Sequence, residues 1–249
     1  MTLGLIEAEA VGQALRKSRR QLLVGHVLRY HPAISQLEQL VRAGMFGTLR
    51  HFSSQRLGRP APGTRLTAWW ELGPHDVSLA RAFFAADPTF ISTKSSGPQK
   101  VKAHLLFPQG KTAELLVGTG DNGTGDNGRV RRIILRGTDA IARFDDRDST
   151  SRARIHQLVP SGEVAADVEE QTTVRQLSHD AAQDALGLEL HHFAEAVSHN
   201  APVLTNFEEG ARVVAILEAG ARSLANAGEW TRIEFKSDSC PVTKRAQVT

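Results

Sequence analysis

The segment Glu71-Leu-Gly-Pro-His75-Asp76 places an imidazole between two carboxylates, a combination suited to proton transfer. A neutral imidazole can accept a proton at physiological pH, and a nearby carboxylate can orient the ring or share the proton. His75 is therefore a candidate general base, and Glu71 a candidate partner for it. The same residues also fit a structural interpretation, in which Asp76 complements a helix dipole, His75 packs and Glu71 is solvated.

The residues that follow predict the helix that positions this segment. Val77, Ala80 and Phe83 recur at helical spacing, and Pro74 suits the first turn of a helix. We therefore predict a helix that begins at Pro74 and carries His75 in its first turn. The helix dipole at that end disfavours a positive imidazolium, so His75 would stay neutral.

The chain before this helix predicts two further helices and two strands. Residues 5–20 and 32–43 carry apolar side chains at helical spacing, and Gly44 suits a helix end. Residues 21–30 include a continuous apolar run, which indicates a buried strand, and residues 48–58 alternate as a strand.

The middle of the chain predicts a broad sheet. Short alternating runs separated by turn residues recur at 89–96, 100–107, 112–118, 129–137, 140–146, 152–159 and 171–177. The expected fold class is therefore α/β (α+β), with a large, mainly antiparallel open sheet and flanking helices.

Two helices and one strand close the pattern. The first helix carries one apolar stripe of Leu186, Leu190, Phe193 and Val197. The second opens with the capping-box pattern Thr205-Asn-Phe-Glu208 and stops near Gly228. Residues 229–235 resemble a last strand, and residues 236–249 are expected to form a disordered tail.

Composition excludes several classes of protein. The 249 residues carry a formal net charge of +3 and one cysteine, Cys240, so there is no disulfide framework and a reducing, cytoplasmic compartment fits. Lysine and arginine are dense only at residues 16–20, which argues against nucleic-acid binding. No apolar run approaches the ~20 residues of a membrane span, and no basic segment opens a signal peptide.

Two motifs resemble ligand sites without the context that such sites need. Gly118 to Gly123, GTGDNG, matches a dinucleotide fingerprint, but a strand pattern rather than a helix follows it, and Asp-Asn-Gly is typical of hairpin turns. Glu189 and His192 have the E-x-x-H spacing of carboxylate-bridged metal sites, but no second E-x-x-H accompanies them. We therefore expect neither cofactor binding nor metal binding at these motifs.

Four segments in order resemble the Gfo/Idh/MocA oxidoreductases. They are LLVGHVLRYHPAI, GMFGTLRHFSSQRLG, WWELGPHDVSL and the closing run from Leu188 to Leu224, so the similarity extends to about Phe235. The resemblance implies an oxidoreductase that uses NAD or NADP to oxidise or reduce a carbinol of a sugar, polyol or nucleotide sugar.

The resemblance also implies roles for single residues. His75 matches the catalytic histidine, and Glu71 stands where the family usually has aspartate. Arg29 lies in the turn that leads out of the last Rossmann strand. Arg29, Trp70 and Asp76 are the candidate substrate-binding residues.

In the family, a G-x-G-x-x-[GA] turn and a Glu-Lys-Pro motif both precede the helix that starts here at Met1. Neither motif is present in this sequence. The expected domains are thus residues 1–30, a remnant of a Rossmann domain, and residues 31–235, a substrate and oligomerisation domain. The chain alone is not expected to bind NAD(P), and no cofactor-binding residues are assigned.

Three interpretations stay open. The first is a family dehydrogenase represented by an incomplete chain, and the second is a cofactor-free binding or assembly module derived from that family. The third is a metal-dependent isomerase or lyase that would use His26, His31, His75 and His104, although their spacing suits no metal site. In each case a homo-dimer or higher oligomer is expected, through the uncovered apolar face of the sheet.

Overall fold

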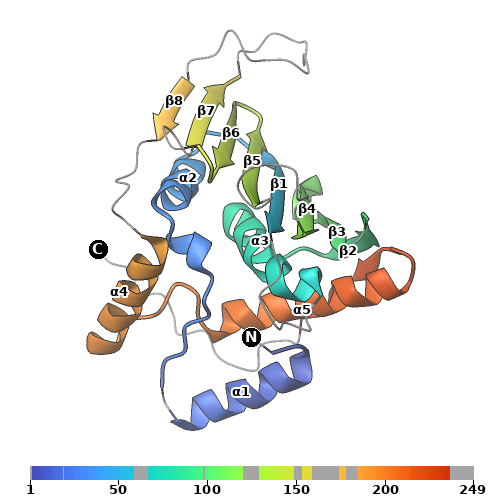
Figure 1. Ribbon diagram of the computed structural model, residues 1–249. Coiled ribbons are helices and arrows are strands. Elements are labelled where there is room, and N and C mark those ends of the chain that lie inside the picture. Colours follow the sequence, from blue (N-terminus) through green and yellow to red (C-terminus); the bar gives the residue numbers. More distant parts are fainter. Residues whose placement is uncertain are drawn as a thin grey trace.

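The structure of the chain is a computed structural model that describes residues 2–18, 20–58, 67–97, 99–119, 129–148, 153–158, 174–177 and 184–235. The helices are α1 (Leu5–Ser18), η1 (Val27–Tyr30), α2 (Pro32–Arg42), α3 (Ala68–Phe84), η2 (Pro108–Gly110), α4 (Ala185–Ser198) and α5 (Phe207–Ala225). The strands are β1 (Leu49–Gly58), β2 (Phe90–Ser95), β3 (Lys100–Leu106), β4 (Thr112–Thr119), β5 (Val130–Gly137), β6 (Ala140–Asp145), β7 (Ala153–Gln157), β8 (Val174–Leu177) and β9 (Thr231–Arg232). Figure 1 shows their arrangement.

The strands form a single open sheet of nine, in the order β8-β7-β6-β5-β1-β4-β3-β2-β9. All neighbours are antiparallel except the central pair β1 and β4, which is parallel. The predicted fold class is confirmed, and every strand pattern of the middle region forms a strand.

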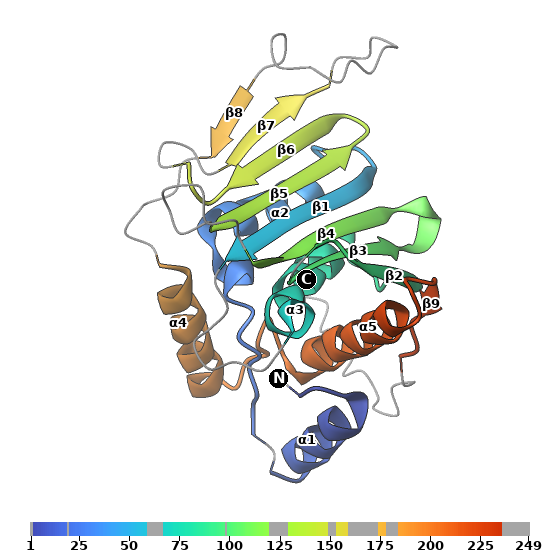
Figure 2. The same ribbon diagram turned by 45° about the vertical axis from the view of Figure 1, so that its right-hand side comes forward.

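The helices α2, α3 and α5 lie on one side of this sheet (Figure 2). α3 packs on β1 and β4, and α5 packs on β2 and on α3. Alternate side chains of each strand point into this layer, and Phe52, Leu115, Leu135 and Phe144 are completely buried there. The alternation of the strands therefore places the core between the sheet and the helices.

The helix that carries His75 differs from its prediction. α3 begins at Ala68, so Pro74 lies inside the helix and His75 lies near its middle. Proline lacks the N–H that would bond to the carbonyl four residues earlier, which is why it resembled a helix start. The first-turn location of His75 was wrong, because buried packing around Trp69 and Gly73 continues the helix through the proline.

The strand predicted over residues 21–30 is also wrong. Residues 20–26 have no regular structure and continue into η1, with the Val24 amide bonded to the Thr205 carbonyl at 2.7 Å. No strand of the described residues pairs with this apolar run, and Val24 lies against Gly210 of α5. The assignment of residues 1–30 to a Rossmann remnant stays a prediction.

Two smaller predictions need correction. The cap of α5 is Asn206, whose side chain accepts from the Glu209 amide at 3.0 Å, one residue later than the predicted capping box. β4 and β5 do not form a hairpin, because β1 lies between them. The connection itself, residues 120–128, lies outside the described residues, as does the predicted tail 236–249.

Candidate active site

His75 faces the interior from the middle of α3. Burial first, and then the guanidinium groups of Arg56 and Arg131, lower its pKa from 6.5 to about 3. The imidazole is therefore neutral at physiological pH, as the sequence predicted, but desolvation and two cations cause this rather than the helix dipole.

A second histidine lies beside it. The ring of His26 stands edge-on to that of His75, with 6.0 Å between the centroids. His26 is buried, its Nε2 atom has no hydrogen-bond partner among the described residues, and burial followed by the neighbouring His75 lowers its pKa to about 3. The sequence suggested His26 beside His75 only as a metal ligand of the third interpretation, and not as a neighbour of the candidate base, because it lies 49 residues earlier in a segment predicted to be a strand.

Asp76 forms a buried ion pair across the sheet interface. Its two carboxylate oxygens accept from Nε and Nη2 of Arg56 at 2.7 and 3.3 Å. This fork joins α3 to β1 directly beside His75, so Asp76 has a structural partner that explains its burial. Its assignment as a substrate-binding residue stays a prediction.

Glu71 and Trp70 lie on the first turns of α3. Glu71 is partly exposed and precedes His75 by four residues, so the two side chains project from the same side of the helix. Trp70 is partly buried and packs against the hydrophobic core. Their roles toward the imidazole and the substrate stay predictions.

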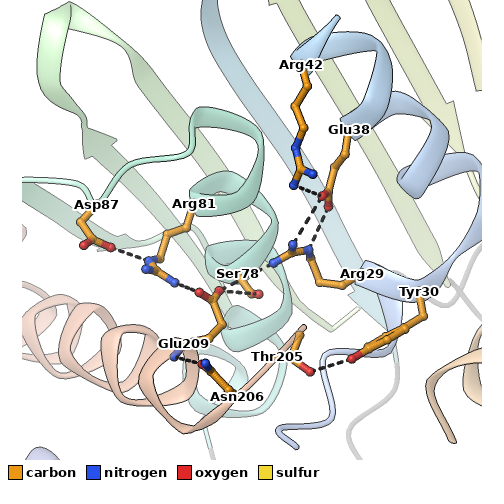
Figure 3. Close-up of polar contacts among 10 residues, drawn as sticks. All are labelled: Arg29, Tyr30, Glu38, Arg42, Ser78, Arg81, Asp87, Thr205, Asn206 and Glu209. Carbon is orange, nitrogen blue, oxygen red and sulfur yellow. Dashed lines mark hydrogen bonds and ion pairs between the residues drawn. The ribbon is translucent and has the colours of Figure 1, made fainter. Parts of the chain in front are cut away.

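Arg29 lies in a buried polar network that fixes η1 (Figure 3). Its Nε donates to Glu38 of α2 at 2.8 Å, and its Nη1 lies 3.8 Å from Glu209 of α5. The negative charges of these two carboxylates compensate the positive charge of Arg29, which is only 7% exposed. Arg29 therefore anchors the turn that carries His26, and its predicted substrate contact stays a prediction.

Glu209 extends the network to α3. It accepts hydrogen bonds from Ser78 and Arg81, and Arg81 also pairs with Asp87 at 2.6 Å. The neighbouring Tyr30 hydroxyl lies 3.1 Å from the Thr205 hydroxyl. These contacts hold η1, α3 and α5 in one arrangement, which sets the distance between His26 and His75.

A cavity of about 380 Å³ lies at the ends of β1 and β5, next to α3. It is lined by Arg56, Leu57, Gly58, Leu72, Arg129, Val130 and Arg131. The sequence did not single out its arginines, because alternation gives the face of each strand and not the pairing of two strands that are distant in the chain. Arg56 and Arg131 are direct partners across β1 and β5, both on the helix side of the sheet.

The remaining candidate metal ligands are separated. His31 caps α2 by accepting from the Ala33 amide, and His104 lies beside Glu114 on the opposite face of the sheet. His192 accepts from the Leu204 amide at 3.0 Å, and burial raises the pKa of Glu189. Within the described ranges, no three His, Cys, Asp or Glu side chains gather as metal ligands.

Only Gly118 and Thr119 of the dinucleotide-like motif lie within the described residues, so its predicted lack of cofactor binding stays a prediction. Gly118 and Thr119 end β4, and the next described element is strand β5. A pyrophosphate site of this type needs a helix N-terminus at that point.

The family model of the Gfo/Idh/MocA oxidoreductases, "Oxidoreductase family, C-terminal alpha/beta domain", matches residues 39–232. The chain belongs to this family. The predicted family is thus confirmed, and the matched range contains three of the four segments, all except residues 22–34.

The chain is also similar in sequence and structure to individual members of the family. UDP-N-acetylglucosamine 3-dehydrogenase from Acidithiobacillus ferrooxidans is 28% identical over 217 residues, which cover 86% of this chain and 66% of that enzyme. A solved structure of that enzyme superposes with a TM-score of 0.73 at 24% identity and covers 91% of this chain and 69% of that one.

Two further structures share the fold. They are aldose-aldose oxidoreductase from Caulobacter crescentus complexed with glycerol (TM-score 0.75, 16% identity, 93% and 70% coverage) and levoglucosan dehydrogenase in complex with NADH and L-sorbose (TM-score 0.76, 15% identity, 94% and 72% coverage). The chain therefore spans about two thirds of the length of these relatives. None of the described helices is both long and apolar enough to cross a membrane.

Proposed function

We propose that this chain provides the substrate domain of an NAD(P)-dependent dehydrogenase that acts on a hydroxyl carbon of a sugar, polyol or nucleotide sugar. The observation that carries the proposal is the neutral, partly buried imidazole of His75, one helical turn after Leu72 of the cavity lining. The relatives support it, because their names describe dehydrogenases and oxidoreductases of sugars.

In this proposal His75 accepts the proton of the substrate hydroxyl. Its low pKa makes it a weak base in the free site, and an anionic group bound nearby would raise that pKa. Glu71 orients or assists the imidazole from one turn away. Arg29, Trp70 and Asp76 line or support the substrate position, the first and last of them through the ion pairs that they already form.

The nicotinamide cofactor would supply the hydride acceptor when bound. Of the one glycine-rich match only Gly118 and Thr119 are described, and they end strand β4, so no described residue of this chain is assigned to its pyrophosphate. We therefore assign only substrate binding and proton transfer to this chain. The lack of assigned cofactor-binding residues among the described ones favours a second candidate function, a cofactor-free binding or assembly module derived from the family.

Joining the chain to a cofactor-binding segment separates the two candidates. The fusion would place the nucleotide-binding portion of the A. ferrooxidans enzyme before Met1, and would be assayed with NAD and NADP against polyols and nucleotide sugars. We expect turnover, and His75→Ala should lower the rate ~10²- to 10⁴-fold, the usual weight of a general base. A folded fusion that binds NADH but shows no turnover supports the assembly module instead.

The matched control is His191→Ala, because His191 is an exposed histidine of α4. It should leave the rate within a factor of about two, as surface substitutions usually do. If His75→Ala behaves like this control, His75 is a packing residue and the assignment of the base is wrong. For the chain alone, calorimetric titration with NADH should show no micromolar binding.

A further inference from the structure

The cavity beside His75 contains an uncommon pair of like charges. Arg56 of β1 and Arg131 of β5 stand directly opposite each other on the helix side of the sheet. Like charges in this cross-strand arrangement destabilise a sheet, and here both groups are also partly or wholly withdrawn from water. A third guanidinium, Arg129, lines the same cavity.

Among the described residues, two carboxylates form ion pairs with these three cations. Asp76 is held by Arg56, while Asp146 lies 3.1 Å from Arg131 and 4.0 Å from Arg129. Burial first, and then Arg56, lower the pKa of Arg131 to about 10, which shows how strongly the surroundings disfavour its charge. An anion bound in the cavity would compensate this excess of positive charge.

The cavity is also in the right place to act with His75. Leu72, one of its lining residues, is one helical turn before His75 on α3, and both Arg56 and Arg131 are near enough to lower the pKa of His75. A group bound by the arginines would therefore hold the rest of its molecule next to the imidazole. The volume of about 380 Å³ suits one charged group with an attached sugar ring.

We propose that Arg129 and Arg131, supported by the Arg56–Asp76 pair, bind the phosphoryl or carboxylate group of an anionic sugar substrate. Guanidinium groups match the oxygens of either anion with paired hydrogen bonds. The inference rests on the proposed function, because it names the substrate class for the same site. It favours nucleotide sugars, sugar phosphates and sugar acids over neutral polyols.

The test measures ligand binding to the chain as it exists, by calorimetry at low salt. The ligands are UDP-N-acetylglucosamine, glucose 1-phosphate, glucuronate and neutral N-acetylglucosamine. We expect saturable binding of at least one anionic sugar and none of the neutral sugar, and the ranking of phosphate esters against glucuronate identifies the anion. Equal binding of neutral and anionic sugars overturns the proposal, and so does the absence of binding for all four.

The variants use two adjacent arginines of β5 that point to opposite faces. Arg131→Gln should weaken binding ~10- to 100-fold through loss of a charge-assisted contact, and Arg131→Lys should restore part of it. Arg132→Gln is the matched control: Arg132 pairs with Asp145 at 2.7 Å on the open face, outside the cavity. Equal losses for Arg131→Gln and Arg132→Gln would mean unspecific attraction and contradict the site.

Two measurements keep the result unambiguous. If Arg131→Gln fails to fold, Arg129→Gln decides, because the Arg129 side chain is 60% exposed and its loss leaves the core intact. The fused enzyme then separates this inference from the proposed function. Turnover of neutral polyols unaffected by Arg131→Gln refutes the anion site alone, whereas anion binding that depends on Arg131 in an inactive fusion refutes the dehydrogenase alone.

Discussion

α4 and α5 follow each other in the chain and carry similar apolar stripes, but their surroundings differ. On α5, Val213, Ile216 and Leu217 are completely buried against α3 and the sheet. On α4, Leu190 is 61% exposed and Val197 is 56% exposed. An apolar stripe thus predicts that a helix forms, and it does not by itself predict what covers the helix.

α1 resembles α4 in this respect, since Ile6 is 82% exposed. Both helices lie at the periphery of the molecule in Figures 1 and 2, with α1 against α5 and α4 against η1. The layer of α3 and α5 therefore holds the folded core, and α1 and α4 contribute less to it. This contrast gives four predictions about stability and association.

The largest effect should come from matched leucine truncations. Leu217→Ala on α5 should lower the free energy of unfolding by about 2–5 kcal/mol, because it leaves a cavity in a fully buried site. Leu190→Ala on α4 should change it by less than about 0.5 kcal/mol. Urea denaturation of both variants measures the difference, and equal losses would show that α4 is covered in solution.

The next largest change in stability should come from glycine-to-alanine substitutions, which should destabilise the chain on α5 and stabilise it on α4. A Cβ at Gly220 of α5 would lie 2.6 Å from the Trp69 ring, so Gly220→Ala should cost about 1–3 kcal/mol. At Gly187 of α4 the nearest atom is 3.9 Å away, so Gly187→Ala should stabilise the chain by about 0.4–1 kcal/mol. Thermal unfolding of both variants checks the two signs, and a stabilising Gly220→Ala would contradict the close packing of α3 on α5.

The buried histidines should make the core layer sensitive to acid. Because the folded pKa of His75 is about 3 and its ordinary value is 6.5, the unfolded chain binds a proton in this interval that the folded chain does not. Stability from this group is complete above about pH 6.5 and is lost as the pH falls toward 3. His75→Gln should therefore reduce the slope of unfolding free energy between pH 4.5 and 6 by about 1.4 kcal/mol per pH unit.

His191→Gln on the exposed face of α4 is the control for this titration and should leave the slope unchanged. Urea denaturation at several pH values supplies the data. His26→Gln should act in the same direction as His75→Gln, since burial also lowers the pKa of His26. An unchanged slope in both core variants would mean that water reaches the two rings.

The contrast between these regions also explains which features could be predicted from the sequence. Alternation and turn residues predicted the strands because each strand has one buried face, and the neighbouring carboxylates made His75 a candidate base, an assignment that stays a prediction. The cause of its neutrality was not found, because Arg56 and Arg131 come from strands 75 residues apart in the chain. Pro74 misled the prediction of the helix start, since packing that outweighs a local propensity leaves no local signal.

The uncovered face of the sheet was expected to be apolar, and its described residues are mostly polar. Arg132, Arg136 and Arg143 are exposed there, and Lys102 pairs with Glu114 at 3.0 Å. Two apolar side chains, Leu116 of β4 and Ile134 of β5, lie near its centre on either side of β1. An apolar centre with a charged rim is the usual composition of a protein interface.

The predicted homo-dimer therefore has a specific test, with the smallest expected effect on folding. Light scattering at tens of micromolar should show a dimer for the parent chain. Ile134→Glu should shift it to a monomer, because the new carboxylate would be buried in the interface, while its cross-strand neighbour Arg143 keeps the variant folded. Leu190→Glu places the same charge on the exposed apolar stripe of α4, the competing surface, and should leave a dimer formed through the sheet intact. Dissociation by Leu190→Glu and not by Ile134→Glu would move the interface from the sheet to α4, and a monomeric parent chain would remove it altogether.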